Sequence, residues 1–171
     1  PPGLQTVLSA SSLGEDPDER WDHEDRRTIV RRAESLVTAL RPLLLFADHL
    51  CLVDPYFDFQ KPRFTRVLER IFETFRERTT PMPQSLTLVV GPNQTLSNLE
   101  RGAKSWCKRF GLQGDLLVRT IQLEEFDRPK EKLHNRYLLT ELGGVYAGTG
   151  FDSSDGSQDS ETDDITVLSA A

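Results

Sequence analysis

The chain has 171 residues, which is enough for one domain with a hydrophobic core and too few for two domains of ordinary size. With 37% hydrophobic and 28% charged residues its composition is that of a globular protein, and its longest apolar run, residues 43–47, is far shorter than the roughly 20 residues that span a bilayer. The formal net charge of −6 argues against non-specific attraction of the whole surface to nucleic acid or anionic lipid.

The chain begins with a polar, acidic stretch. We expect residues 1–21 to be a flexible lead-in and residues 22–171 to form a single domain, because Pro17 and the dense charges around it make a poor core. From about Asp22, apolar residues return at three- and four-residue steps as far as Leu40, with Ile29 among them, and this spacing predicts a helix. Pro42 should break or kink it, with a further helical turn or two in residues 43–48.

Strand-like and helix-like segments then alternate. Residues 49–53, 85–90 and 116–121 are expected strands, and residues 63–78 and 96–110 are expected amphipathic helices. Asp54-Pro55-Tyr56 follows the first strand, where a proline keeps the preceding residue out of the helical region. The alternation predicts an α/β fold with a mainly parallel, mixed sheet flanked by helices on both faces.

The last part of the chain has a different pattern. Residues 136–140, 145–148 and 165–168 are short β-like runs without a helix between them, and Gly143-Gly144 is placed to form a hairpin turn. Residues 152–164 are rich in Asp and Ser but lack the glycine and glutamate offsets of a calcium-binding loop. A mobile acidic loop is the prediction for this segment.

Other residues that could carry chemistry lie outside the hairpin: Cys51, Cys107, His23, His49, Lys104, Lys108 and Arg109. Two cysteines cannot build a disulfide framework, so buried reduced thiols in a cytoplasmic protein are expected. The histidines and cysteines lack the spacing of a zinc site, and we expect no metal and no cofactor. The basic residues follow helical spacing, which favours a solvated helix face over nucleic-acid contact.

The hairpin carries the most informative motif of the chain, HNRYLLTELGGVYAGT at residues 134–149. The motif resembles the signature of the phospholipase D superfamily, which reads His-x-Lys, then four residues and an Asp, then six residues and Gly-Ser. The matching positions here are His134, Arg136, Glu141 and Thr149. Phe151 stands where that signature has an Asn. On a strand, side chains two residues apart point to the same face, so His134 and Arg136 should lie side by side.

The resemblance implies a role for each position. In phospholipase D enzymes the His is the nucleophile, the Lys binds phosphate, and a second His comes from another copy of the motif. This chain has one copy, so an active form would have to be a symmetric homodimer. The catalytic residues would be His134, Arg136 and Glu141, and the ligand-binding residues His134, Arg136 and Thr149. Asp54 and Tyr56 flank the end of the first strand and are candidates to line the same cleft, but Asp-Pro-Tyr more often ends a strand with a buried ring, which favours a structural role for them.

The departures from the signature bear on the activity. Arg136 offers phosphate a bidentate fork in place of an ammonium, and Phe151 removes an amide that would help to bind phosphate. The order of elements, together with His-Asn-Arg and Gly-Thr-Gly-Phe-Asp, also resembles the non-catalytic phospholipase D-like domain that follows microtubule-interacting-and-trafficking (MIT) modules. On base rates, an isolated His-x-Arg is more often a surface pair or a core His bonded to a carboxylate such as Glu141.

Two hypotheses follow. The first is a non-catalytic phospholipase D-like module, part of a larger protein or assembly, that binds a partner protein or a phosphate-bearing ligand such as nucleic acid or a phospholipid headgroup. The second is a dimeric, metal-independent phosphodiesterase, a nuclease or a phospholipase, that uses His134 as nucleophile.

Overall fold

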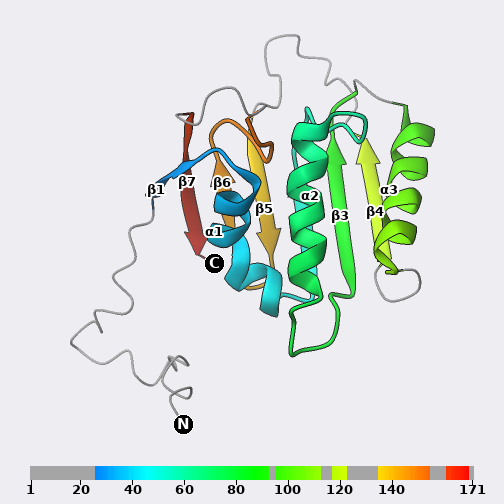
Figure 1. The fold of residues 1–171 in the computed structure, drawn as a ribbon, viewed down its shortest axis with the longest axis horizontal. Helices are drawn as coiled ribbons and strands as arrows, with labels where there is room; N and C mark the ends of the chain where they lie inside the picture. The colour runs from blue at the N-terminus through cyan, green and yellow to red at the C-terminus, as the bar shows by residue number, and fades with distance from the viewer. Residues whose placement is uncertain (1–25, 93–94, 113–116, 123–134, 155–160, 170–171) are drawn as a thin grey trace.

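The computed structural model describes residues 26–92, 95–112, 117–122, 135–154 and 161–169. In these residues a seven-stranded sheet with the order β1-β7-β6-β5-β2-β3-β4 is covered by three helices (Figure 1). The elements in chain order are β1 (Arg26–Val30), α1 (Ala33–Phe46), β2 (His49–Val53), α2 (Pro62–Phe75), β3 (Ser85–Val90), α3 (Leu96–Phe110), β4 (Leu117–Gln122), β5 (Arg136–Thr140), β6 (Gly143–Ala147) and β7 (Thr162–Ser169).

The sheet is mixed, and the predicted α/β class is confirmed. Strands β2, β3 and β4 are parallel and are joined through α2 and α3, as expected for strand-helix-strand units. The other neighbours, β2-β5, β5-β6, β6-β7 and β7-β1, are antiparallel, so antiparallel pairs outnumber parallel ones in the described sheet. The prediction of a mainly parallel sheet fits only the strands β2, β3 and β4 from the first part of the chain. In the last part β5 and β6 are joined by a tight hairpin, which only antiparallel strands can form.

The three described helices form one layer. Rings of Phe72 on α2 and Phe110 on α3 lie 5.3 Å apart, and Arg70 on α2 forms an ion pair of 2.8 Å with Glu34 on α1. Helices were expected on both faces, but among the described residues they cover one. The strand order explains this difference, because right-handed crossovers that step from β2 to β3 to β4 in one direction place both connecting helices on the same side.

The first elements differ from the sequence prediction. Residues 26–30, including Ile29, form strand β1 instead of the first turns of a helix, and they pair with β7 from the far end of the chain. That pairing joins residues more than 130 positions apart, which local periodicity does not report. Helix α1 begins at Ala33 and runs through Pro42 to Phe46, so the proline neither ends the helix nor separates a second one.

The core lies between the sheet and the helix layer. Leu50 and Leu52 of β2 and Leu86 and Leu88 of β3 are at most 3% exposed, and they belong to the same core as the phenylalanines of α2. Pro62 starts α2, where its missing N–H costs nothing. Gly111 ends α3 in the left-handed conformation, with φ of 67°.

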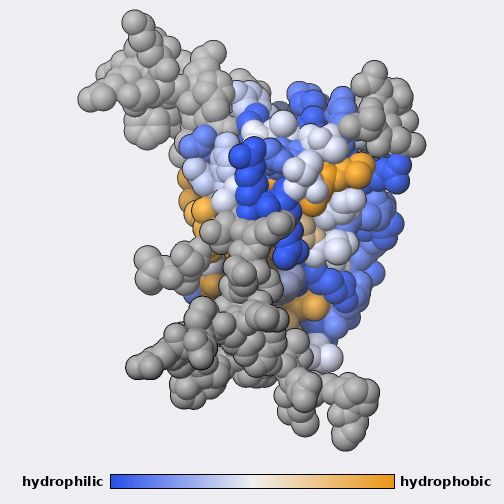
Figure 2. Space-filling model, turned by 90° about the vertical axis from the view of Figure 1, so that its left-hand side faces the viewer, coloured by the Kyte–Doolittle hydropathy of each residue, from blue (hydrophilic) through white to orange (hydrophobic). Residues whose placement is uncertain are grey.

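The opposite face of the sheet carries partly exposed apolar side chains. Leu117, Ile121 and Leu139 are 51%, 47% and 39% exposed, and the strand register puts all three on the side away from the helices. Figure 2 views the molecule from the β1-β7 edge with the helix layer to the right, and hydrophobic residues show along the opposite margin. No helix in the described part of the chain is long and apolar enough to cross a bilayer.

Candidate functional site

The motif residues occupy both ends of one strand. Arg136 is the first residue of β5, and Glu141 follows its last residue, Thr140. At about 3.4 Å per residue, Arg136 and Thr140 are roughly 14 Å apart along the strand. His134 lies outside the described residues, so its predicted position beside Arg136 stays a prediction.

Glu141 is bonded to the backbone at the start of β2. Its two carboxylate oxygens accept hydrogen bonds from the N–H groups of Asp48, at 2.5 Å, and His49, at 3.0 Å. Partial burial acts to raise the pKa of Glu141, but these N–H donors outweigh it and leave the pKa below its ordinary value. These bonds join the β5-β6 hairpin to the start of β2. The expected role of Glu141 beside His134 stays a prediction, because His134 lies outside the described residues.

Arg136 lies over the strand end that carries Asp54. Its guanidinium carbon is 4.9 Å from the centroid of the Tyr56 ring, within the range of a cation-π contact, and its Nη1 donates a hydrogen bond of 2.9 Å to the carbonyl of Gly148. The Nε atom is buried and has no hydrogen-bond partner among the described residues. The structure therefore brings Arg136 and Tyr56 together, and their role in binding a ligand stays a prediction.

Asp54 is 1% exposed and is surrounded by donors. Its carboxylate accepts the N–H of Tyr56 at 2.9 Å and the N–H of Phe151 at 3.1 Å. Burial raises the pKa of Asp54 above its ordinary value, although both N–H groups and the nearby charge of Arg136 oppose that rise. Asp54 thus fixes the backbone of the turn that contains Phe151, and its burial keeps it from direct contact with a ligand in solution.

Residues 148–152, Gly-Thr-Gly-Phe-Asp, form the turn that follows β6, and we call them the motif turn. Gly150 has φ of +122°, a conformation that residues with a side chain rarely adopt. A methyl group there would lie 3.2 Å from Oδ2 of Asp54 and 3.5 Å from Nε of Arg136. Glycine at this position lets the turn pass directly over both groups.

Two further buried aspartates fix the same turn, and the sequence prediction missed both. Asp163, which is 4% exposed, accepts the N–H of Thr149 at 3.1 and 3.2 Å. Asp152, also 4% exposed, forms ion pairs with Arg31 and, at 3.3 Å, with Arg63. Both belong to the acidic run that was predicted to be a mobile loop. That prediction is wrong for these two residues; residues 155–160 lie outside the described ones.

Phe151 occupies the position where the phospholipase D signature has an Asn. Its side chain is 1% exposed and belongs to the hydrophobic core, while its backbone N–H is bonded to Asp54. A core ring at this point contributes no polar group to a ligand.

Thr149 faces a different space from Arg136. It lines a surface pocket of about 450 Å³ together with Tyr146, Asp163 and Asp164, and Arg136 is not among the lining residues. The structure thus brings together Arg136, Tyr56 and Asp54, whereas Thr149 lines a separate pocket beside the same turn. No group of three or more His, Cys, Asp or Glu side chains that could coordinate a metal occurs in the described ranges.

Comparisons with known proteins support the fold of the chain but do not assign it a function. No protein-family profile and no curated protein sequence matches the chain. Its structure resembles the crystal structure of phosphatidylserine synthase from Haemophilus influenzae Rd KW20, with a TM-score of 0.51 and 13% sequence identity over 85% of this chain and 33% of that one. The chain spans about a third of the length of that protein, whose fold is phospholipase D-like. The likeness supports the phospholipase D-like fold that the motif predicted.

Proposed function

We propose that this chain is a phospholipase D-like module that binds a phosphate-bearing ligand without hydrolysing it, as part of a larger protein or assembly. The observation that carries the proposal is the guanidinium of Arg136. Tyr56 and the carbonyl of Gly148 fix its position, but only Nη1 donates a hydrogen bond to a described residue. A fixed guanidinium with unused donors suits the oxygens of a phosphate group.

Two further arginines lie near the motif turn, and both are paired with Asp152. Arg31 and Arg63 approach the turn through Asp152, and the Arg63 side chain is 38% exposed. Asp152 and, for Arg31, Glu161 offset the positive charge of these two arginines. Arg136 is therefore the cation on which the proposed phosphate ligand depends.

The buried ring of Phe151 favours binding over catalysis. Hydrolysis requires donors that stabilise the charge developing on the phosphate oxygens, and the core position of Phe151 withdraws one such donor. The module's resemblance to the domain that follows MIT modules agrees with a binding role. A partner protein in place of a phosphate ligand would be one outcome of the test below.

The test measures binding and hydrolysis separately. Vesicles with and without phosphatidylserine and a single-stranded oligonucleotide are offered to the wild type, to Arg136→Gln and to Arg101→Gln, an exposed arginine on α3. We expect binding to one of these phosphate ligands to weaken about tenfold in Arg136→Gln, the scale of one lost charge-assisted hydrogen bond, and to be unchanged in Arg101→Gln.

Hydrolysis of bis(4-nitrophenyl) phosphate in EDTA is followed for the wild type and for His134→Ala, with the mass in solution determined by light scattering. We expect no turnover in either protein. A dimer whose activity disappears in His134→Ala would establish the phosphodiesterase instead. Absence of binding to every phosphate ligand would refute the proposed ligand class and leave protein recognition.

A further inference from the structure

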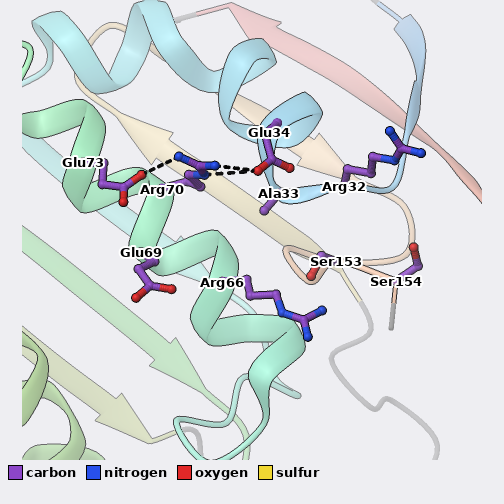
Figure 3. A pocket seen from close by; sticks show the side chains of 9 residues that line it. All are labelled: Arg32, Ala33, Glu34, Arg66, Glu69, Arg70, Glu73, Ser153 and Ser154. Carbon is purple, nitrogen blue, oxygen red and sulfur yellow. Dashed lines mark hydrogen bonds and ion pairs between the residues drawn. The ribbon is translucent and has the colours of Figure 1, made fainter. Parts of the chain in front are cut away.

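A second polar pocket lies on the helix side of the motif turn, away from Arg136. It has a volume of about 370 Å³ and is formed by the start of α1, the outer face of α2 and the serines that follow the turn (Figure 3). Its floor is Ser153 and Ser154, and Arg66 on α2 forms part of its wall. Neither Arg136 nor Tyr56 lines it, so it is distinct from the site described above.

The carboxylates of this pocket are already bonded to arginines. Arg70 donates to Glu34 at 2.8 Å and to Glu73 at 2.7 Å, and Arg109 pairs with Glu69 at 2.5 Å. Figure 3 shows the Glu34-Arg70-Glu73 cluster at one end of the pocket and Arg66 extending toward the serines at the other. The two ends therefore differ in character, and the end near the serines is open to an anion.

Two arginines that line the pocket, Arg32 and Arg66, lie outside the Glu34-Arg70-Glu73 cluster, and of these Arg66 extends toward the serines. Among the described residues it has no hydrogen bond and no ion pair, in contrast to Arg70 on the next turn of α2. An unpaired guanidinium beside a polar floor presents several donors in a fork that matches the oxygens of a phosphate group.

The two serine hydroxyls are bonded redundantly. The N–H of Ser153 donates to the carbonyl of Arg63 at 2.9 Å, and its hydroxyl reaches the same oxygen at 3.2 Å. Ser154 repeats this arrangement with the carbonyl of Arg31, at 2.9 and 3.1 Å. Because the backbone bond alone satisfies each carbonyl, the hydroxyls can rotate toward a ligand without leaving an acceptor unpaired.

We propose that Arg66, Ser153 and Ser154 form a binding site for a phosphate group, either the free ion or the monoester of a small molecule. The guanidinium contributes the charge and the bidentate contact, and the two adjacent hydroxyls donate to the remaining oxygens. The backbone bonds to Arg63 and Arg31 fix the main chain of both serines before a ligand arrives. This site does not depend on the proposed function at Arg136.

The experiment is an NMR titration of the full chain with inorganic phosphate and with glycerol 3-phosphate, against sodium chloride at equal ionic strength. We expect saturable shifts at the amides of Ser153 and Ser154 and at Nε of Arg66. The dissociation constant should rise about tenfold in Arg66→Gln and about fivefold in Ser154→Ala. It should be unchanged in two matched controls on α3, Arg101→Gln and Ser105→Ala, and in Arg136→Gln.

The outcomes separate this site from the proposed function. Stronger binding of inorganic phosphate assigns the site to the free ion, and stronger binding of glycerol 3-phosphate assigns it to a monoester. Shifts that sodium chloride reproduces, or that are the same in wild type and Arg66→Gln, would overturn the proposal. Shifts lost in Arg136→Gln and kept in Arg66→Gln would also overturn it, because the phosphate would then bind at the motif.

Discussion

Replacing Gly150 by alanine tests the account of the motif turn. The φ of +122° costs a residue with a side chain about 1–3 kcal/mol, and the new methyl group would press on Asp54 at 3.2 Å. Part of this destabilisation is offset, because alanine reduces the conformational entropy of the unfolded chain and so stabilises the folded state by about 0.4–1 kcal/mol. Since Asp54 is buried and bonded at both sides, it has little room to move, and we expect a net loss of about 2–3 kcal/mol.

Gly111→Ala is the matched control for this change. Gly111 also has positive φ, at 67°, but a methyl group there meets nothing within 4 Å. We expect a loss of about 1 kcal/mol or less, since only the left-handed backbone conformation is penalised. Urea denaturation followed by circular dichroism measures both variants. Equal losses, or a Gly150→Ala variant within about 0.5 kcal/mol of the wild type, would refute the close approach of the turn to Asp54.

Two further predictions concern carboxylates. The ¹³C titration of Asp54 should give a pKa above the ordinary value, and Arg136→Gln should raise that pKa further, since the arginine charge lowers it; an unchanged pKa would contradict the contact. Because its folded pKa is raised, Asp54 should favour the native state as pH falls toward that pKa. Glu141 acts in the opposite sense: its lowered pKa means that its stabilisation is lost as pH falls through the folded pKa. Glu141→Gln should cost about 1 kcal/mol at pH 7, discounted for exposure, and should flatten the acid side of the pH-stability curve; an unaltered curve would count against the β2 bond.

The sequence predicted the elements that local chemistry determines. Strands β2 and β3 and helix α3 have the expected bounds, because apolar periodicity, proline breakers and Gly111 act within a few residues. The register of β1 with β7 depends on partners at opposite ends of the chain. Ile29 fitted a helical pattern equally well, and only the distant strand decided its conformation.

The site was predictable in part for the same reason. The spacing of the motif located Arg136 and the glycine turn, and Asp54-Pro55-Tyr56 marked the strand end that lies beside them. Asp152 and Asp163 sit in a run of acids whose other members give no reason to single them out. Their importance comes from burial and from the groups that bond to them, which the sequence pattern does not report.

The three buried aspartates bond the motif turn in two different ways. The carboxylates of Asp54 and Asp163 lie outside the turn and accept its backbone N–H groups. Asp152 belongs to the turn, and its carboxylate pairs with arginines outside it. The shape of the turn at position 149 therefore does not require a particular side chain. Thr149 could be replaced by other residues that keep the backbone N–H while the turn keeps its conformation. The side chain at this position can therefore vary, and with it the ligand preference of the adjacent pocket, without loss of the turn.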